Sequence, residues 1–484
     1  MADPIRIENY IGGSLRAPAS RDYLDDYEPA TGRVYAKTPE SDEADLTDAV
    51  AAAETAFAEW RATSTDARAG LLLDLAARID AQAEAFAQAE SIDTGKPIRL
   101  ARDIDIPRAS ANLRFYAAAA TQFASESHAM EGAINYTLRQ PHGVVACISP
   151  WNLPLYLLTW KIAPALAAGN CVIAKPSEVT PMTAYLFAQL CIEAGVPPGV
   201  LNILHGTGSG IGHALVTHPA IRAISFTGGT VTGRRIAKEA APLFKKLSLE
   251  LGGKNPTIVF GDCDWDRMLA TTLRSAFSNQ GQICLCGSRI FVEQSVYERF
   301  CEDFVKLARA LRVGDPLDAS TEQGAIVSRP HMDKVLGCIA LARDEGCNVL
   351  CGGAQLVLEG PRCAEGWFIS PTVIEGLPSD CRTNQEEIFG PVVTLIPFTD
   401  EEEVLEQANA IPYGLAASLW SSDVKRCHRM AAALEAGIIW INTWMLRDLR
   451  TPMGGMKASG VGREGGMEAM RFFTEAKNVC VNYV

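Results

Sequence analysis

The apolar positions in the centre of the chain alternate between short continuous runs and longer segments of helical spacing. Residues 143–148 form an apolar run of strand length, and residues 154–168 follow as an apolar helix that begins at a proline. Residues 171–175 predict the next strand, and a second helix begins at Thr180–Pro181 and ends at Gly195. This alternation is typical of strand–helix–strand units around a parallel sheet.

Further along, residues 200–204 and 223–226 predict two more strands of this sheet. Ligands of open parallel sheets bind beyond the carboxyl ends of the strands. Three motif positions lie at or just after such ends: Trp151–Asn152, Lys175 and Gly228. We therefore expect them to face a ligand, and the fold class to be α/β with a doubly wound, mostly parallel sheet.

The pattern changes outside this region. After residue 250 a second α/β region predicts strands at 288–292, 392–397 and 437–442. Nearer the N-terminus, residues 65–95 place apolar side chains at helical spacing and predict one helix.

Two segments alternate like strands but fit neither region. They are residues 133–139 and the tail at 478–484. An apolar terminal strand with a free edge would invite pairing with another chain, so we expect these segments to be covered.

The length of 484 residues is too great for one core and predicts two or three domains. No apolar signal region follows Met1, and no apolar run reaches transmembrane length. The 14 cysteines lack paired zinc-binding spacing, so no metal site is expected. We expect reduced thiols in a cytoplasmic protein.

A net charge of −13 argues against nucleic acid or an anionic membrane as a partner. It also means that an anionic substrate would require locally placed arginines.

Two motifs carry the candidate chemistry. Residues 250–256 (ELGGKNP) offer a carboxylate base, and residues 279–284 (NQGQIC) offer a thiol nucleophile. Five other blocks accompany them: SPWN at 149–152, KPSE at 175–178, FTGG at 226–229, EEIFGP at 386–391 and PMGGMK at 452–457. In order and spacing, these blocks resemble the aldehyde dehydrogenase superfamily over essentially the whole chain.

The resemblance implies a Rossmann-like NAD-binding domain from residues 1–122 and 142–251, and a catalytic domain from residues 252–468. It also implies that residues 123–141 and 469–484 form an oligomerisation flap. A homodimer and a homotetramer are both compatible with the sequence.

The resemblance assigns the nucleophile to Cys284, with Cys286 as its nearest rival. A thiolate adds readily to an aldehyde carbonyl and later leaves from a thioester. The side-chain amide of Asn152 and the backbone N–H of Cys284 would bind the resulting oxyanion. Glu250 would be the general base that activates water, which indicates hydrolysis of the thioester rather than transfer to coenzyme A.

The implied cofactor is NAD. Lys175 and Glu178 match residues that hold the adenosine ribose, where a carboxylate favours a free 2′-hydroxyl over a 2′-phosphate. The glycines from Gly228 open a helix whose N–H groups suit a pyrophosphate. The residues expected to contact NAD are Ile148, Ser149, Pro150, Trp151, Lys175, Ser177, Glu178, Gly208, Phe226, Thr227, Gly228, Gly229, Thr232, Leu251, Gly252, Glu387 and Phe389.

The substrate pocket is expected to include Arg108, Arg447, Leu153 and Trp160. The blocks around them resemble those of 2-aminomuconic and 2-hydroxymuconic semialdehyde dehydrogenases, which oxidise an unsaturated semialdehyde that carries a carboxylate. Arginine binds carboxylates through a planar fork. Arg450 is an alternative partner, and the sequence does not separate an amino from a hydroxy substrate.

Two alternative functions are compatible with the same fold. A betaine-aldehyde or general aliphatic aldehyde dehydrogenase would use the same catalytic residues. A relative that kept the fold but lost catalysis would be expected to lack Cys284, Glu250 or Asn152, and all three are present.

Overall fold

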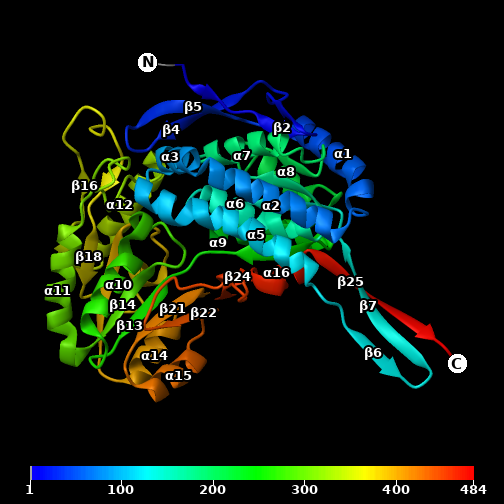
Figure 1. Cartoon of the computed structure of the whole chain (residues 1–484). Helices are drawn as coiled ribbons and strands as arrows, with labels where there is room; N and C mark the ends of the chain where they lie inside the picture. The colour runs from blue at the N-terminus through cyan, green and yellow to red at the C-terminus, as the bar shows by residue number, and fades with distance from the viewer. Residues whose placement is uncertain (1–2) are drawn as a thin grey trace.

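A large sheet forms the centre of one half of the molecule in the computed structural model, which describes residues 3–484 (Figure 1). Its strand order is β24-β12-β11-β8-β9-β10-β2-β3. Five consecutive strands of this sheet run parallel: β12 (Lys246–Glu250), β11 (Ile221–Thr227), β8 (Val144–Ile148), β9 (Cys171–Lys175) and β10 (Leu201–Ile203). The predicted strands and their parallel pairing are therefore confirmed.

Helices cover both faces of this sheet, as expected for a doubly wound fold. β8 and β9 are buried along their whole length, which explains their continuous apolar sequence. One face carries α2 (Thr65–Ala81), α5 (Ile106–Thr121), α6 (Pro154–Ala167), α7 (Met182–Glu193) and α16 (Gly466–Phe472). The other face carries α1 (Glu43–Trp60), α8 (Ile211–Thr217) and α9 (Thr230–Ala240).

The prediction of a single helix over residues 65–95 is wrong. The chain forms α2 and then α3 (Ala83–Thr94), because Gln82 leaves the helical conformation with φ −113° and ψ 19°. The apolar spacing continues across this one-residue break, so periodicity alone could not reveal it. The stop at Gly95 is confirmed, since this glycine caps α3 with a left-handed φ of 75°.

A seven-stranded sheet forms the centre of the other half, in the order β15-β18-β19-β14-β13-β21-β22. Its strands are β15 (Asn348–Cys351), β18 (Thr372–Glu375), β19 (Val392–Phe398), β14 (Gly287–Glu293), β13 (Asn255–Val259), β21 (Ala416–Trp420) and β22 (Ile438–Ile441). Around them pack α10 (Trp265–Phe277), α11 (Tyr297–Ala310), α12 (Arg329–Asp344), α14 (Glu401–Asn409) and α15 (Val424–Ala433). The second predicted α/β region is confirmed.

The two segments that fitted neither region pair with each other. β7 (Ala133–Pro141) lies between β6 (Ser127–Met130) and β25 (Thr474–Asn482), in a three-stranded antiparallel sheet that projects from the body (Figure 1). The C-terminal strand begins at Thr474 and ends at Asn482, which is earlier than predicted. We call this sheet the flap.

The N-terminal segment completes the first half. It contributes β2 (Asn9–Ile11) and β3 (Ser14–Arg16) to the large sheet, and a small sheet of β1 (Ile5–Arg6), β5 (Arg33–Pro39) and β4 (Tyr23–Glu28). None of the helices within residues 3–484 combines the length and apolar character needed to cross a membrane.

One short strand connects the C-terminal part of the chain to the large sheet. β24 (Gly460–Val461) pairs antiparallel with β12, opposite Leu249 and Glu250. The PMGGMK block at 452–457 is thereby brought close to the end of β12, where a Cβ on Gly454 would lie 2.7 Å from a carboxylate oxygen of Glu250.

Candidate active site

The candidate nucleophile follows an unusual turn. α10 ends at Phe277, and Asn279, Gln280 and Gly281 then take left-handed conformations with φ of 51°, 55° and 69°. At Gly281 a Cβ would lie 2.1 Å from the carbonyl oxygen of Gly390, so a side chain there is excluded. The turn sends the chain back toward the large sheet and places Cys284 between the two halves.

Side chains of the motif itself stabilise this turn. The amide of Gln280 donates to the carbonyl of Ala325 (2.7 Å) and accepts from the N–H of Gly324 (3.2 Å). The amide oxygen of Gln282 accepts from the N–H of Val327 (3.1 Å). These contacts offset the cost of consecutive left-handed residues, which is of order 1–3 kcal/mol each.

Asn152 lies against the same turn. Its side-chain N–H donates to the backbone carbonyl of Gln282 (2.8 Å). Its backbone carbonyl accepts from the side chains of Lys96 (2.9 Å) and Asn279 (3.1 Å). Lys96 is fully buried and also bonds to Asp105 (2.5 Å). Asn152 is therefore held through both its side-chain amide and its backbone carbonyl.

Cys284 is half-buried and lines two spaces that meet at its side chain. Burial, together with the charges of Glu387 and Glu250, raises the pKa of its thiol to about 12, whereas the charge of Arg447 acts to lower it. Its rival Cys286 is buried, and its sulfur lies 4.0 Å from the carbonyl of Ser278. Cys286 lines neither space, so the geometry favours Cys284 as the nucleophile.

Glu250 ends β12 and is only 3% exposed. Neither of its carboxylate oxygens has a hydrogen-bond partner within residues 3–484. Burial and the charge of Glu464 hold its pKa well above the ordinary range. Glu464 itself accepts from Lys161 (2.7 Å) and Ser225 (2.8 Å), so a buried polar network lies next to Glu250.

A pocket of about 500 Å³ lies at the carboxyl ends of β8, β9 and β11. The predicted cofactor residues that line it are Ile148, Ser149, Pro150, Trp151, Lys175, Ser177, Glu178, Gly208, Phe226, Thr227, Gly228, Gly229 and Thr232. Trp151, Lys175 and Gly228, which were expected at or just after strand ends, are among them. Contact with a cofactor stays a prediction.

The pocket fits a dinucleotide. The hydroxyls of Ser149 and Thr227 are buried without a partner in the described part of the chain, so they are available to a ligand. α9 begins at the pocket wall after Gly229, with no side chain capping its free N–H groups. The ammonium of Lys175 lies 3.3 Å from the carboxylate of Glu178, which places a donor and an acceptor together for ribose hydroxyls.

A second space of about 230 Å³ continues from this pocket to Cys284. The other predicted cofactor residues line it: Leu251, Gly252, Glu387 and Phe389. Glu387 accepts from the N–H of Gly253 (2.8 Å). Phe389 packs edge-on against Trp151, with ring centroids 5.2 Å apart.

Two further lining residues were not predicted from the sequence. His331 bonds through Nε2 to the carbonyl of Phe389 (2.7 Å), and its ring centroid lies 5.0 Å from that of Trp151. Lys334 donates to the carbonyl of Glu387 (3.2 Å). Both lie on α12, whose sequence carries no recognisable motif, so no local signal pointed to them.

On the other side of Cys284 lies a small chamber lined by Glu250, Leu153, Tyr156, Met453 and Arg447, among others. Arg447 donates to the hydroxyl of Tyr156 (3.0 Å), and its guanidinium lies 5.6 Å from the ring centroid of Trp160. Among the residues that line this chamber, Tyr156 and Met453 were not predicted as substrate residues.

Arg108 approaches the same two aromatic rings. Its guanidinium lies 5.5 Å from the ring centroid of Tyr156 and 5.7 Å from that of Trp160. Its Nε and Nη2 are buried without a hydrogen-bond partner among residues 3–484. Burial and the nearby charge of Arg447 lower its pKa. Two cations therefore share one aromatic-lined site, an arrangement suited to an anionic ligand.

Arg450 does not line the chamber. Its side chain is 80% exposed and pairs with Asp448 at 2.6 Å. It therefore points into solvent, and Arg447 rather than Arg450 is the arginine of the 443–450 loop that lines the chamber.

Comparison with known proteins agrees with this arrangement. The aldehyde dehydrogenase family matches residues 16–479. The 2-aminomuconic semialdehyde dehydrogenase of Danio rerio is 51% identical over 480 residues, covering 99% of this chain and 98% of that protein. The 2-hydroxymuconic semialdehyde dehydrogenase of Pseudomonas sp. (strain CF600) is 45% identical, covering 98% and 99%.

A solved structure shares the fold. The NAD+ complex of an aldehyde dehydrogenase from Bacillus cereus has a TM-score of 0.96 and 39% identity, covering 99% of this chain and 97% of that one. With its two α/β halves, its projecting flap and a family match that spans nearly its whole length, the chain belongs to the aldehyde dehydrogenase family.

Proposed function

We propose that the protein uses NAD to oxidise a carboxylated, unsaturated semialdehyde, 2-aminomuconic or 2-hydroxymuconic 6-semialdehyde, to the dicarboxylic acid. The observation that carries the proposal is the pair Arg108 and Arg447, which lie over Trp160 next to the Cys284–Glu250 chamber. The names of the relatives support the same substrate class.

Cys284 is the nucleophile of the first step. Its buried thiol must lose a proton before it attacks, and Arg447 favours the thiolate. Addition of the sulfur to the aldehyde carbon forms a thiohemiacetal whose oxyanion accepts from the amide of Asn152 and the N–H of Cys284. Removal of one such donor typically lowers the rate by about 10²–10³.

NAD, when bound, supplies a nicotinamide that accepts a hydride. Glu387 and Phe389 line the space in which that ring would lie against Cys284, and Glu178 favours a cofactor with a free 2′-hydroxyl.

The thioester left on Cys284 is then hydrolysed. Glu250, on the chamber side of the sulfur, takes a proton from water that attacks the thioester carbon. The carbon–sulfur bond breaks, Glu250 returns its proton to the sulfur of Cys284, and the carboxylic acid is released. The raised pKa of Glu250 suits a group that accepts a proton in a dry site, because its protonated form is favoured there.

The far carboxylate of the substrate would be held by Arg108 and Arg447. Hydrogen bonds to charged groups contribute about 1.5–3 kcal/mol each. The unpartnered donors of Arg108 are already desolvated, so less free energy is lost when they bind an anion.

Three further proposals accompany this function. The flap would join copies of the chain into a homodimer or homotetramer. All described cysteines are free, which supports a reducing compartment such as the cytoplasm. We also propose the division into an NAD-binding domain (1–122 and 142–251), a catalytic domain (252–468) and the flap segments.

The test is NADH formation with NAD and a panel of aldehydes. The panel contains 2-hydroxymuconic semialdehyde, betaine aldehyde, acetaldehyde and hexanal. We expect kcat/KM to be roughly a hundredfold higher for the muconic substrate. Equal rates across the panel would overturn the carboxylate assignment, and a preference for betaine aldehyde would favour the alternative function.

A further inference from the structure

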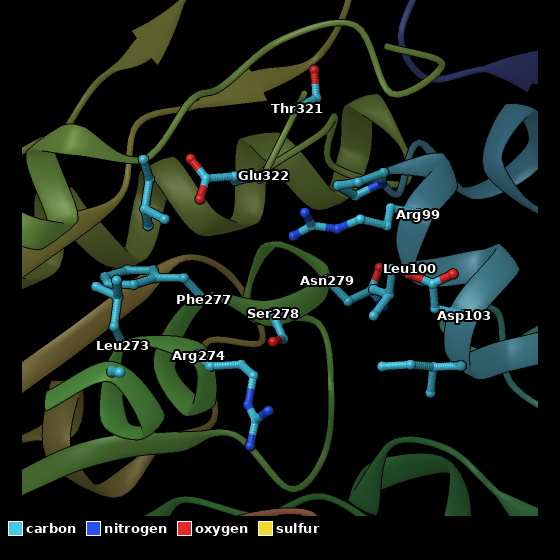
Figure 2. Close-up of a pocket in the computed structure, with 14 residues that line it drawn as sticks. Arg99, Leu100, Asp103, Leu273, Arg274, Phe277, Ser278, Asn279, Thr321 and Glu322 are labelled. Atoms are coloured by element: carbon cyan, nitrogen blue, oxygen red, sulfur yellow. The ribbon is translucent and has the colours of Figure 1, made fainter. Parts of the chain in front are cut away.

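A pocket of about 340 Å³ lies beside the catalytic turn and shares no lining residue with the spaces described above (Figure 2). One wall is the helical segment formed by α4 (Ile98–Leu100) and the π-helix at Ala101–Asp105 that follows it. α10 and the residues around Glu322 form the other walls. No part of the proposed reaction uses this pocket.

Asn279 links the pocket to the active site. Its side chain is nearly inaccessible to solvent, at 2% exposure, yet it lines the pocket, and its Oδ1 has no donor within residues 3–484. Its Nδ2 donates to the carbonyl of Asn152 (3.1 Å) and to that of Gln282 (3.3 Å). Buried acceptors are normally paired in folded proteins, so Oδ1 is available to a ligand that donates a hydrogen bond.

The pocket carries charges of both signs. Arg99 makes no ion pair within the described residues and extends into the space in Figure 2. Arg274 donates to the carbonyl of Trp444 (3.4 Å), lies over the ring of the same residue and makes no ion pair in the described part of the chain. Asp103 makes no ion pair among residues 3–484, and Glu322 pairs with Arg312 at the exposed rim (3.4 Å). A ligand with a single charge would therefore face unfavourable groups as well as favourable ones.

The remaining wall is apolar. Leu100, Leu273 and Phe277 line it, and the volume suffices for a ligand the size of a large amino acid. Ligand sites commonly combine such a wall with a few polar groups that fix orientation.

We propose that this pocket binds a zwitterionic α-amino acid with an apolar side chain. The carboxylate pairs with Arg99, and the ammonium group donates to Asp103 and to Oδ1 of Asn279. The side chain packs against Leu273 and Phe277. Because Asn279 also holds Asn152, an occupied pocket stabilises the turn that positions the catalytic groups.

The test is isothermal titration of the full-length protein with L-phenylalanine, in the absence of aldehyde and NAD. We expect a dissociation constant of roughly 1 mM or tighter. Phenethylamine and 3-phenylpropionate, which each keep one of the two charges, should bind at least about tenfold more weakly. Arg99→Ala and Asp103→Asn should each weaken phenylalanine binding about tenfold.

Arg102→Ala is the matched control, because Arg102 neighbours these residues but pairs with Glu84 and does not line the pocket. It should bind phenylalanine as the wild type does. No binding up to about 10 mM phenylalanine, equal binding of 3-phenylpropionate, or unchanged binding by Arg99→Ala would each overturn the proposal. Since the titration contains no aldehyde, its outcome is independent of the proposed oxidation.

Discussion

At the scale of single residues, the site combines groups whose charged forms are unfavourable. Cys284 and Glu250 are both desolvated, and burial raises the pKa of each. Burial therefore disfavours the charged form of each group, so their activation depends on the groups around them. Arg447 favours the thiolate, and Glu387 opposes it.

Replacement of Glu387 should make the thiol more reactive. Glu387→Gln keeps an acceptor for the N–H of Gly253 but removes a negative charge, so the pKa of Cys284 should fall. We expect the rate of inactivation by iodoacetamide at pH 8 to rise up to about tenfold, with the pH profile shifted to lower pH.

Glu386→Gln is the control, because this neighbour is exposed and pairs with Arg382 instead. Its inactivation profile should match the wild type. An unchanged profile for Glu387→Gln would show that the charge of Glu387 does not affect the pKa of the Cys284 thiol.

The arginines allow a second test at this scale. Arg108→Ala and Arg447→Ala should each lower kcat/KM for a carboxylated aldehyde about 10- to 100-fold, because each removes a charge-assisted hydrogen bond. With hexanal, which lacks a carboxylate, Arg108→Ala should lose much less. Arg450→Ala should leave both values within about twofold, since Arg450 faces solvent. A large loss in Arg450→Ala would reverse the assignment.

At the scale of elements, the turn from Asn279 to Gly281 decides where the sulfur lies. Three successive left-handed residues are stable only because Gln280 and Gln282 bond to the 324–327 segment and Gly281 has no side chain. The turn is therefore a rigid support for Cys284 rather than a mobile loop.

Gly281→Ala should disrupt this support. A methyl group would meet the carbonyl of Gly390 at 2.1 Å, and backbone rarely moves enough to relieve such an overlap. We expect kcat/KM to fall at least about a hundredfold, because small displacements of reacting groups have effects of that size. Gly337→Ala on α12, where a Cβ would meet nothing within 4 Å, should be active and slightly more stable.

Much of the element arrangement could be predicted from the sequence. The buried strands of the first sheet are short, continuous apolar runs, and their carboxyl ends carried the motif residues that the structure brings to one pocket. The break at Gln82, and the approach of His331 and Lys334, could not be predicted. They depend on how distant elements pack, which leaves no periodic signal in the local sequence.

At the scale of the whole molecule, the flap has two unlike faces. Cross-strand partners point to the same side of an antiparallel sheet, so the register places Ile134, Tyr136, Leu138, Val479 and Val481 on one face. Lys477, opposite Leu138, and the pair Gln140 and Glu475 lie on the same face toward the body of the molecule. Asn135, Thr137, Asn478 and Asn482 lie on the other face. Leu138 and Val481 are 40% and 43% exposed, so the apolar face is partly uncovered in a single chain.

A second copy would cover this apolar face. The double variant Leu138→Asp, Val481→Asp should lower the molar mass measured by light scattering after size-exclusion chromatography, because charged groups are costly in an apolar contact. Asn478→Asp on the polar face should keep the wild-type mass. An unchanged mass in the double variant would place the subunit contact elsewhere.

The pairing of β24 with β12 also bears on how the chain is made. Until β24 is synthesised, β12 is the open edge of the large sheet, and the Gly454 segment is missing from beside Glu250. At about 5–20 residues per second, a ribosome completes this partner roughly 10–40 s after β12. A nascent chain would thus expose an unfinished edge strand for that time, and the carboxylate of Glu250 would become fully enclosed only near the end of translation.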